Sequence, residues 1–171
     1  MNANTNLDAE ALLAHLTDAL YPAVSADTAL VGIYTGGVWL AERLHAALSL
    51  TQPLGTLDVS FYRDDYDAIG LHAQPKPSDI PFDVEGRHII LVDDVLYTGR
   101  TIRAAMNELF DYGRPASIQL AALVDRGGRE LPVYAQYVGT TLTLPPDQLL
   151  ALEKDASGQL QLSVQPWQRR G

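Results

Sequence analysis

Cysteine is absent from all 171 residues of the chain. This absence excludes disulfide frameworks and thiolate metal sites. The sequence also has no apolar run long enough to span a bilayer, and its first residues lack the basic and apolar segments of a signal peptide. We therefore expect a protein without a membrane segment in a reducing compartment, the cytoplasm.

Basic residues are also scarce. The chain has 12 lysines and arginines against 21 acids, which gives a net charge of −9. The first basic residue is Arg43, and the 42 residues before it contain five acids. Because nucleic-acid affinity comes largely from cations that neutralise phosphates, this composition makes RNA binding doubtful. A small phosphorylated substrate remains compatible, since it needs only one local positive site.

The pattern of apolar residues predicts strands that alternate with helices, in a single domain over 1–171 with a core at about 28–145. Such alternation is typical of an α/β fold with a mainly parallel sheet, in which ligands bind at the carboxyl ends of the strands. The expected elements are a helix at 7–20, strands at 28–34 and 54–62, a helix at 38–48 after a turn at 35–37, a strand at 88–93, a helix at 100–111, a strand at 117–125, an extended segment at 134–144 and a terminal hairpin at 147–165.

A long polar segment, 63–81, interrupts this pattern with three prolines and four aspartates. Loops of that length in a compact domain are usually lids, binding loops or disordered segments. We expect a flexible flap at about 66–80. His72 within it is the one histidine that we retain as a candidate functional residue.

The segment "LVDDVLYTGRTIRAAM" at 91–106 carries the strongest chemical signal. The residues from Thr98 to Thr101 open a helix, whose first amides lack intrahelical acceptors and lie at the positive end of its dipole, so they can hold a phosphate. Asp93 and Asp94 end the preceding strand, and ionised carboxylates accept hydrogen bonds from a vicinal diol. Together these groups match a ribose 5-phosphate. The simpler alternatives are that Thr98 only caps the helix and that the acids are solvated.

This segment resembles the phosphoribosyl-pyrophosphate motif of type I phosphoribosyltransferases. Its particular form, "VDDVLYTGRT", is similar to that of the PyrR family of pyrimidine operon attenuators and uracil phosphoribosyltransferases. Three other stretches, 31–41, 58–65 and 113–132, resemble the same family. The resemblance covers most of residues 30–140 and is weaker at both ends of the chain.

The resemblance implies a type I phosphoribosyltransferase fold, in which helices flank a five-stranded, mainly parallel sheet and a small hood covers the site. It implies an enzyme that makes UMP and pyrophosphate from uracil and phosphoribosyl pyrophosphate with Mg²⁺. It also suggests a homo-oligomer, a dimer or larger. The alternatives are a UMP-responsive RNA-binding attenuator of pyrimidine genes, a transferase for another base, or a phosphoribosyl-binding regulator without catalysis.

The resemblance also assigns roles to individual residues. Asp93 and Asp94 would be catalytic, and Mg²⁺ would be held mainly by the substrate, with these two carboxylates as the candidate protein contacts and no dedicated protein site. In full, the ribose 5-phosphate would contact Asp93, Asp94, Tyr97, Thr98, Gly99, Arg100 and Thr101; the pyrophosphate would contact Thr35, Gly36, Gly37 and Arg63; the base pocket would include Val124, Asp125 and Arg126.

Three positions depart from better-known relatives. Tyr97 stands where hypoxanthine-guanine enzymes have an aspartate, which favours a pyrimidine substrate unless Tyr97 only packs against the helix. Gly36 replaces the arginine of a Thr-Arg-Gly pyrophosphate loop, and Gly128 replaces a frequent histidine. We expect Trp39 and Trp167 to be packing residues.

Overall fold

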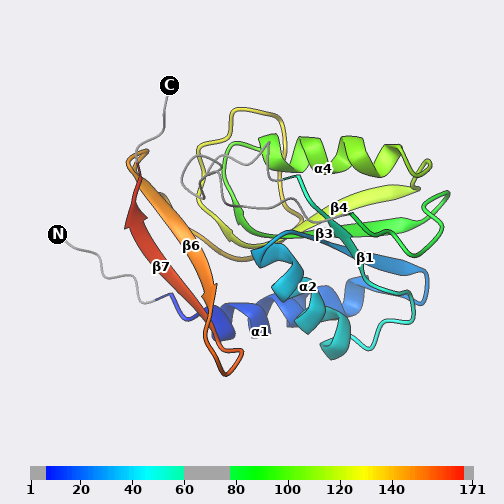
Figure 1. The fold of residues 1–171 in the computed structure, drawn as a ribbon, viewed down its shortest axis with the longest axis horizontal. Coiled ribbons are helices and arrows are strands. Elements are labelled where there is room, and N and C mark those ends of the chain that lie inside the picture. Colours follow the sequence, from blue (N-terminus) through cyan, green and yellow to red (C-terminus); the bar gives the residue numbers. More distant parts are fainter. Residues whose placement is uncertain (1–6, 60–77, 168–171) are drawn as a thin grey trace.

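The fold was analysed in a computed structural model, which describes residues 7–59 and 78–167. Five parallel strands form the central sheet in the order β2-β1-β3-β4-β5 (Figure 1). Their bounds are β1 Thr28–Ile33, β2 Gly55–Leu57, β3 His88–Leu96, β4 Ser117–Asp125 and β5 Tyr137–Thr141. The predicted parallel sheet is confirmed.

Helices cover both faces of this sheet (Figure 1). α1 (Ala9–Leu20) and α2 (Gly36–Ala47) lie on one face, and α4 (Arg100–Phe110) lies on the other; a short 3₁₀ turn, η1 (Tyr21–Ala23), follows α1. Alternate residues of β3 point to opposite faces of the sheet. Ile90 and Val92 pack in the core beneath α1 and α2, and Ile89 and Leu91 pack beneath α4. This two-sided burial explains the near-continuous apolar run of β3.

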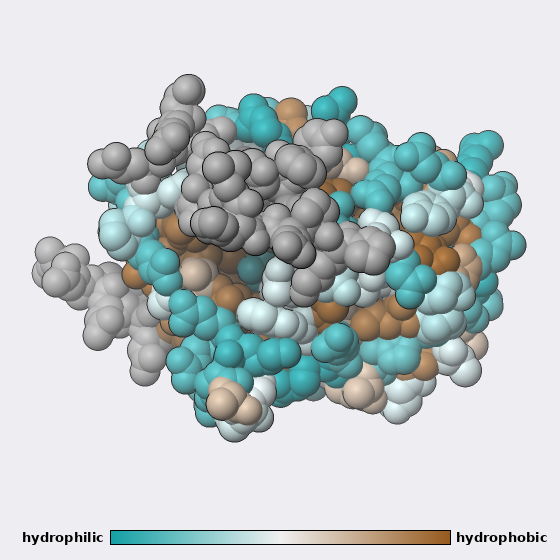
Figure 2. Space-filling model, in the orientation of Figure 1, coloured by the Kyte–Doolittle hydropathy of each residue, from teal (hydrophilic) through white to brown (hydrophobic). Residues whose placement is uncertain are grey.

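A hairpin of β6 (Gln148–Lys154) and β7 (Leu160–Pro166) completes the described chain. It corresponds to the hairpin expected at 147–165, and its Leu150, Leu152 and Leu160 join the core beside α1. Figure 2 shows one face of the molecule, where hydrophilic side chains line much of the lower rim and apolar side chains lie above them. Within 7–59 and 78–167, no helix has both the length and the apolarity to cross a bilayer.

Two element boundaries differ from the expectation in ways that affect the site. β3 continues to Leu96, so Asp93 and Asp94 lie inside the strand and do not follow it; the ladder to β4 persists through Val95 and Leu96. α2 begins at Gly36, so the expected turn at 35–37 is largely the first turn of this helix. The strand expected at 54–62 is described only as Gly55–Leu57, and positions 60–62 lie outside the described residues.

Glu10 connects the hairpin to both helices of its face. Its carboxylate accepts hydrogen bonds from the guanidinium of Arg43 in α2, at 2.6 and 3.3 Å, and from the N–H of Leu160 in β7, at 2.9 Å. The Arg43 hydrogen bond and then that of Leu160 hold the pKa of Glu10 below its ordinary value of 4.5. A carboxylate with a lowered pKa stabilises the fold above its unfolded-state pKa, and this stabilisation is lost as pH falls through the folded-state value.

We therefore predict that Glu10→Gln lowers the free energy of unfolding at pH 7 by on the order of 0.5–1 kcal/mol, a modest value because the ion pair is partly exposed. The deficit should narrow as the pH falls below about 4.5. Urea titrations of both proteins at several pH values would measure it, with Glu42→Gln on the exposed side of α2 as the matched control. A deficit that is constant from pH 7 to pH 3 would contradict the prediction.

Candidate functional site

The site lies where the sheet changes its direction of winding. From β1 the chain passes through α2 on one face to reach β2, whereas β3, on the other side of β1, is followed by α4 on the opposite face (Figure 1). In open α/β sheets, the loops at such a switch point diverge and leave a crevice at the carboxyl ends of the strands. The loop that begins α2 and the loop that begins α4 lie on either side of this switch point.

A sharp turn at residues 97–99 joins β3 to α4. Gly99 has φ +99°, a left-handed conformation that side chains rarely adopt, and it lies against Leu131 and Val133. Thr98 is fully buried; its Oγ1 accepts a hydrogen bond from the N–H of Arg100 at 3.2 Å. The carbonyl of Thr98 accepts from Glu130 and Leu131. The turn is thus fixed on both sides, and it leads into the first amides of α4, which lie at the positive end of the helix dipole.

The two aspartates precede this turn and are buried, with exposures of 1% for Asp93 and 6% for Asp94. The Asp93 carboxylate accepts the N–H of Asp94 at 2.9 Å, and that of Asp94 accepts the N–H of Val95 at 2.9 Å. These bonds fix the orientation of both side chains. The alternative of two solvated loop acids is therefore wrong.

The start of α2 packs directly against the acid pair. A Cβ on Gly36 would lie 2.5 Å from Oδ2 of Asp94, and a Cβ on Gly37 would lie 2.4 Å from the carbonyl oxygen of Val92. Only glycine permits this approach of the helix to β3. The absence of an arginine at position 36 therefore brings the positive end of the α2 dipole beside the carboxylate of Asp94.

Tyr97 packs on the third loop at this edge, the one that follows β4. The guanidinium of Arg126 lies 3.9 Å from the centre of the Tyr97 ring, and Trp167 meets the ring edge-on at 6.1 Å. A Cβ on Gly128 would lie 2.8 Å from the same ring. Tyr97 is thus packed against this loop and against Trp167 at the end of the C-terminal hairpin.

Several predicted site side chains have structural partners. Arg126 is buried and donates to the carbonyls of Leu144, Pro145 and Gln148, so its guanidinium joins β4 to the start of the hairpin. Arg100 forms an ion pair with Glu130. Val124 is fully buried in the core beside α1 and α2.

Asp125 and Arg129 form an ion pair within the loop that follows β4. The Asp125 carboxylate accepts from Arg129 at 2.6 Å and from the N–H of Gly127 at 3.0 Å. Arg129 also donates to the carbonyls of Tyr97 and Val133, at 2.6 and 2.8 Å. The i, i+4 spacing of these opposite charges in a loop was the only available signal, and it is weak.

The remaining predicted site residues lie at the starts of the two helices or outside the described residues. Thr35 is the exposed residue before α2, and Thr101 is buried in the first turn of α4. Arg63, His72 and the flap expected at 66–80 lie outside the described residues.

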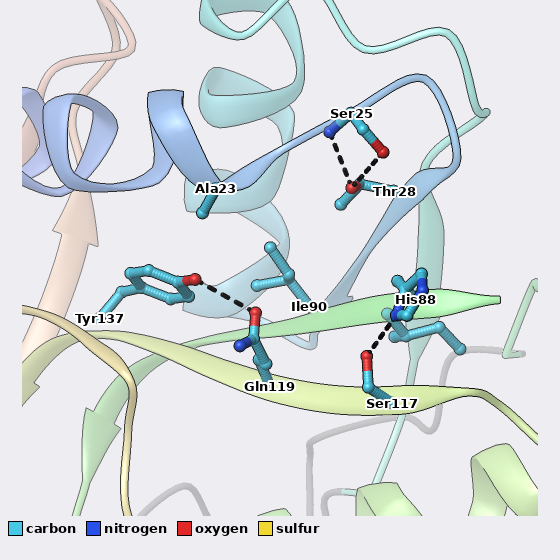
Figure 3. Close-up of a pocket in the computed structure, with 9 residues that line it drawn as sticks. Ala23, Ser25, Thr28, His88, Ile90, Ser117, Gln119 and Tyr137 are labelled. Atoms are coloured by element: carbon cyan, nitrogen blue, oxygen red, sulfur yellow. Dashed lines mark hydrogen bonds between the residues drawn. The ribbon is translucent and has the colours of Figure 1, made fainter.

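A second hollow, of about 510 Å³, lies at the opposite edge of the sheet (Figure 3). Its lining includes the first residues of three strands, Thr28, His88 and Ser117. Polar groups there pair with one another, as in the bonds from Tyr137 to Gln119 and between His88 and Ser117. It is separate from the carboxyl ends of the strands, where the acid pair lies.

Known structures share this fold. Hypoxanthine phosphoribosyltransferase from Trypanosoma cruzi superimposes with a TM-score of 0.61 at 21% identity, over 80% of this chain and 79% of that one. Purine phosphoribosyltransferase from Pyrococcus horikoshii gives a TM-score of 0.59 at 24% identity, over 81% and 87%. At these identities the likeness shows the fold alone, and it confirms the predicted type I phosphoribosyltransferase fold.

Proteins with similar sequences identify the family more narrowly than the shared fold does. The model of the phosphoribosyl transferase domain family matches residues 4–148. The bifunctional protein PyrR of Nitrosococcus oceani is 58% identical over 139 residues, which cover 80% of this chain and 77% of the relative. That of Pseudomonas savastanoi is 58% identical over 126 residues, 74% of each chain. The chain belongs to the PyrR family of phosphoribosyltransferases.

Proposed function

We propose that the protein is a uracil phosphoribosyltransferase, which makes UMP and pyrophosphate from uracil and phosphoribosyl pyrophosphate. The observation that carries this proposal is the buried pair Asp93 and Asp94, held between the N-terminus of α2 and the turn that opens α4. Membership of the PyrR family supports it. In the reaction, the bond from ribose C1 to pyrophosphate breaks, a bond from C1 to uracil N1 forms, and N1 loses its proton.

Each wall of the crevice has a role in this proposal. The amides and hydroxyls of residues 98–101 hold the 5-phosphate, and the carboxylates of Asp93 and Asp94 accept the ribose hydroxyls. As C1 gains positive charge, these preoriented carboxylates stabilise it. The backbone amides of residues 35–37, around the start of α2, hold the pyrophosphate, and Arg63 is proposed to assist.

The donors at this site suit Mg²⁺, a hard cation that prefers oxygen ligands. Asp93 and Asp94 would hold it together with substrate phosphates and water, and when bound it would neutralise charge on the departing pyrophosphate. Within the described residues, no cluster of three or more histidine, cysteine or acidic side chains forms a metal site.

The base is proposed to lie near residues 124–126 and Tyr97. Because the side chains of Val124, Asp125 and Arg126 are committed to the core, to Arg129 and to the hairpin carbonyls, any contact from this segment to uracil is expected through its backbone. Tyr97 replaces the aspartate of hypoxanthine-guanine enzymes, which supports a pyrimidine. A cytoplasmic, homo-oligomeric enzyme is part of this proposal.

The proposed activity has a direct test. The pure protein with Mg²⁺ and phosphoribosyl pyrophosphate should release pyrophosphate with uracil much faster than with hypoxanthine, guanine or orotate. Faster turnover of hypoxanthine or orotate would show that the base assignment is wrong. No release with any base would favour a phosphoribosyl-binding regulator without catalysis.

Asp94→Asn should lower kcat by about 10²–10³-fold, as expected for the loss of one electrostatic stabiliser of the transition state. The substitution removes the charge and little volume, so the folded state should persist. Steady-state rates and circular dichroism would be compared with those of Asp111→Asn, an exposed acid at the end of α4. A near-normal rate in folded Asp94→Asn would exclude Asp94 from the site.

The second candidate function is UMP-responsive RNA binding, because the PyrR relatives are named bifunctional. The charges of this chain oppose it. Besides the lack of cations before position 43, Arg43 and Arg129 pair with acids, and Arg126 binds backbone carbonyls. Fewer cations are then available to neutralise phosphates.

We predict that a pyrimidine-leader hairpin from the source organism binds no more tightly than about 1 µM at physiological salt with UMP, in the range of non-specific binding. Filter binding would measure this, with a scrambled hairpin as control. Submicromolar binding of the leader but not of the scrambled RNA would restore the attenuator role.

A further inference from the structure

Trp167, directly after β7, contains a buried hydrogen-bond donor. The residue is 6% exposed, and its indole Nε1–H has no hydrogen-bond partner among the residues that the structure describes. Buried tryptophan N–H groups usually find an acceptor, and a buried polar group without one calls for an explanation. Packing alone, which we expected for this residue, would be served by an aromatic ring without the N–H.

The position of Trp167 suggests what the missing acceptor is. Its backbone N–H donates to the carbonyl of Asp147 at 2.8 Å, at the start of the hairpin. Its ring meets the Tyr97 ring at 74° with centres 6.1 Å apart. Tyr97 is next to Thr98, the first residue of the proposed phosphate site, and carries Arg126 on its ring. Trp167 therefore lies where the hairpin, the end of β4 and the start of the α4 turn meet.

A ligand in the crevice would extend toward this junction. In the proposed reaction, the 5-phosphate lies at residues 98–101 and the ribose hydroxyls lie on Asp93 and Asp94, so the base is held by the adjoining segments. Uracil has two ring carbonyl oxygens, which are hydrogen-bond acceptors. A site with a buried donor favours a substrate that supplies the matching acceptor, because an analogue without it leaves the donor unpaired.

We propose, on the basis of the proposed uracil transferase activity, that Trp167 is a specificity-determining residue whose indole N–H donates to a carbonyl oxygen of the pyrimidine base. The proposal assigns a role to a residue outside the segments that the family resemblance covers. It also gives the C-terminal hairpin a part in substrate selection.

The first test compares Trp167→Phe with the wild type. Phenylalanine keeps an aromatic ring against Tyr97 but removes the N–H. We expect the KM for uracil to rise about 3–10-fold, the range for one neutral hydrogen bond, with the KM for phosphoribosyl pyrophosphate unchanged. Trp39→Phe is the matched control, because Trp39 lies on α2, half-buried, with Lys154 5.0 Å from its ring centre.

The second readout is one that lost packing would not change. Sulfur is a weaker acceptor than oxygen, so the wild type should prefer uracil over either 2-thiouracil or 4-thiouracil, whichever alters the bonded carbonyl. In Trp167→Phe, that preference should fall several-fold, whereas Trp39→Phe should keep it. An unchanged preference and KM in Trp167→Phe would overturn the proposal.

A fluorescence measurement needs no substitution at position 167. In Trp39→Phe, Trp167 is the single tryptophan. UMP should change its emission, whereas ribose 5-phosphate, which has no base, should not. Equal spectra with and without saturating UMP would overturn the proposal. If the wild type makes no UMP, the proposed function fails and this inference with it; if it makes UMP and Trp167→Phe behaves like the wild type, only this inference fails.

Discussion

The close packing of α2 against the end of β3 is the constraint on which the site depends. Gly36 and Gly37 leave no room for a Cβ between the helix and the strand, at Asp94 and Val92 respectively. This contact places the positive end of one helix dipole beside a buried carboxylate. α4 starts at Arg100, four residues after Leu96, on the opposite face, so a second helix N-terminus follows the same acid pair along the chain.

This arrangement explains how a chain with a net charge of −9 could bind the proposed substrate, which has several phosphates. Helix N-termini provide positive potential from backbone dipoles and need no excess of lysine or arginine. Nearby arginines are used elsewhere, because Arg126 and Arg129 hold the β4 loop on Tyr97 and the hairpin. These arginine side chains thus fix the position of the loop after β4, and backbone amides are proposed to bind the phosphates.

Local sequence patterns identified most of the architecture. The apolar runs located β1, β3 and β4, and the motif at 92–101 identified both the family and the start of α4. The patterns did not reveal the extension of β3 to Leu96 or the start of α2 at Gly36, because pairing with β4 and contact with Asp94 determine those boundaries. The carbonyl partners of Arg126 and the contact between Trp167 and Tyr97 join segments that are distant in sequence, so no local pattern could predict them.

The central claim is that one crevice binds a phosphate at the N-terminus of α4 and a ribose diol on Asp93 and Asp94. Calorimetric titration with UMP and with 2′-deoxy-UMP tests it most directly, because the two ligands differ only in the hydroxyl that completes the diol. The account predicts that UMP binds at least about tenfold more tightly, as expected for a hydrogen bond to a charged acceptor. Equal affinities for the two nucleotides would contradict it.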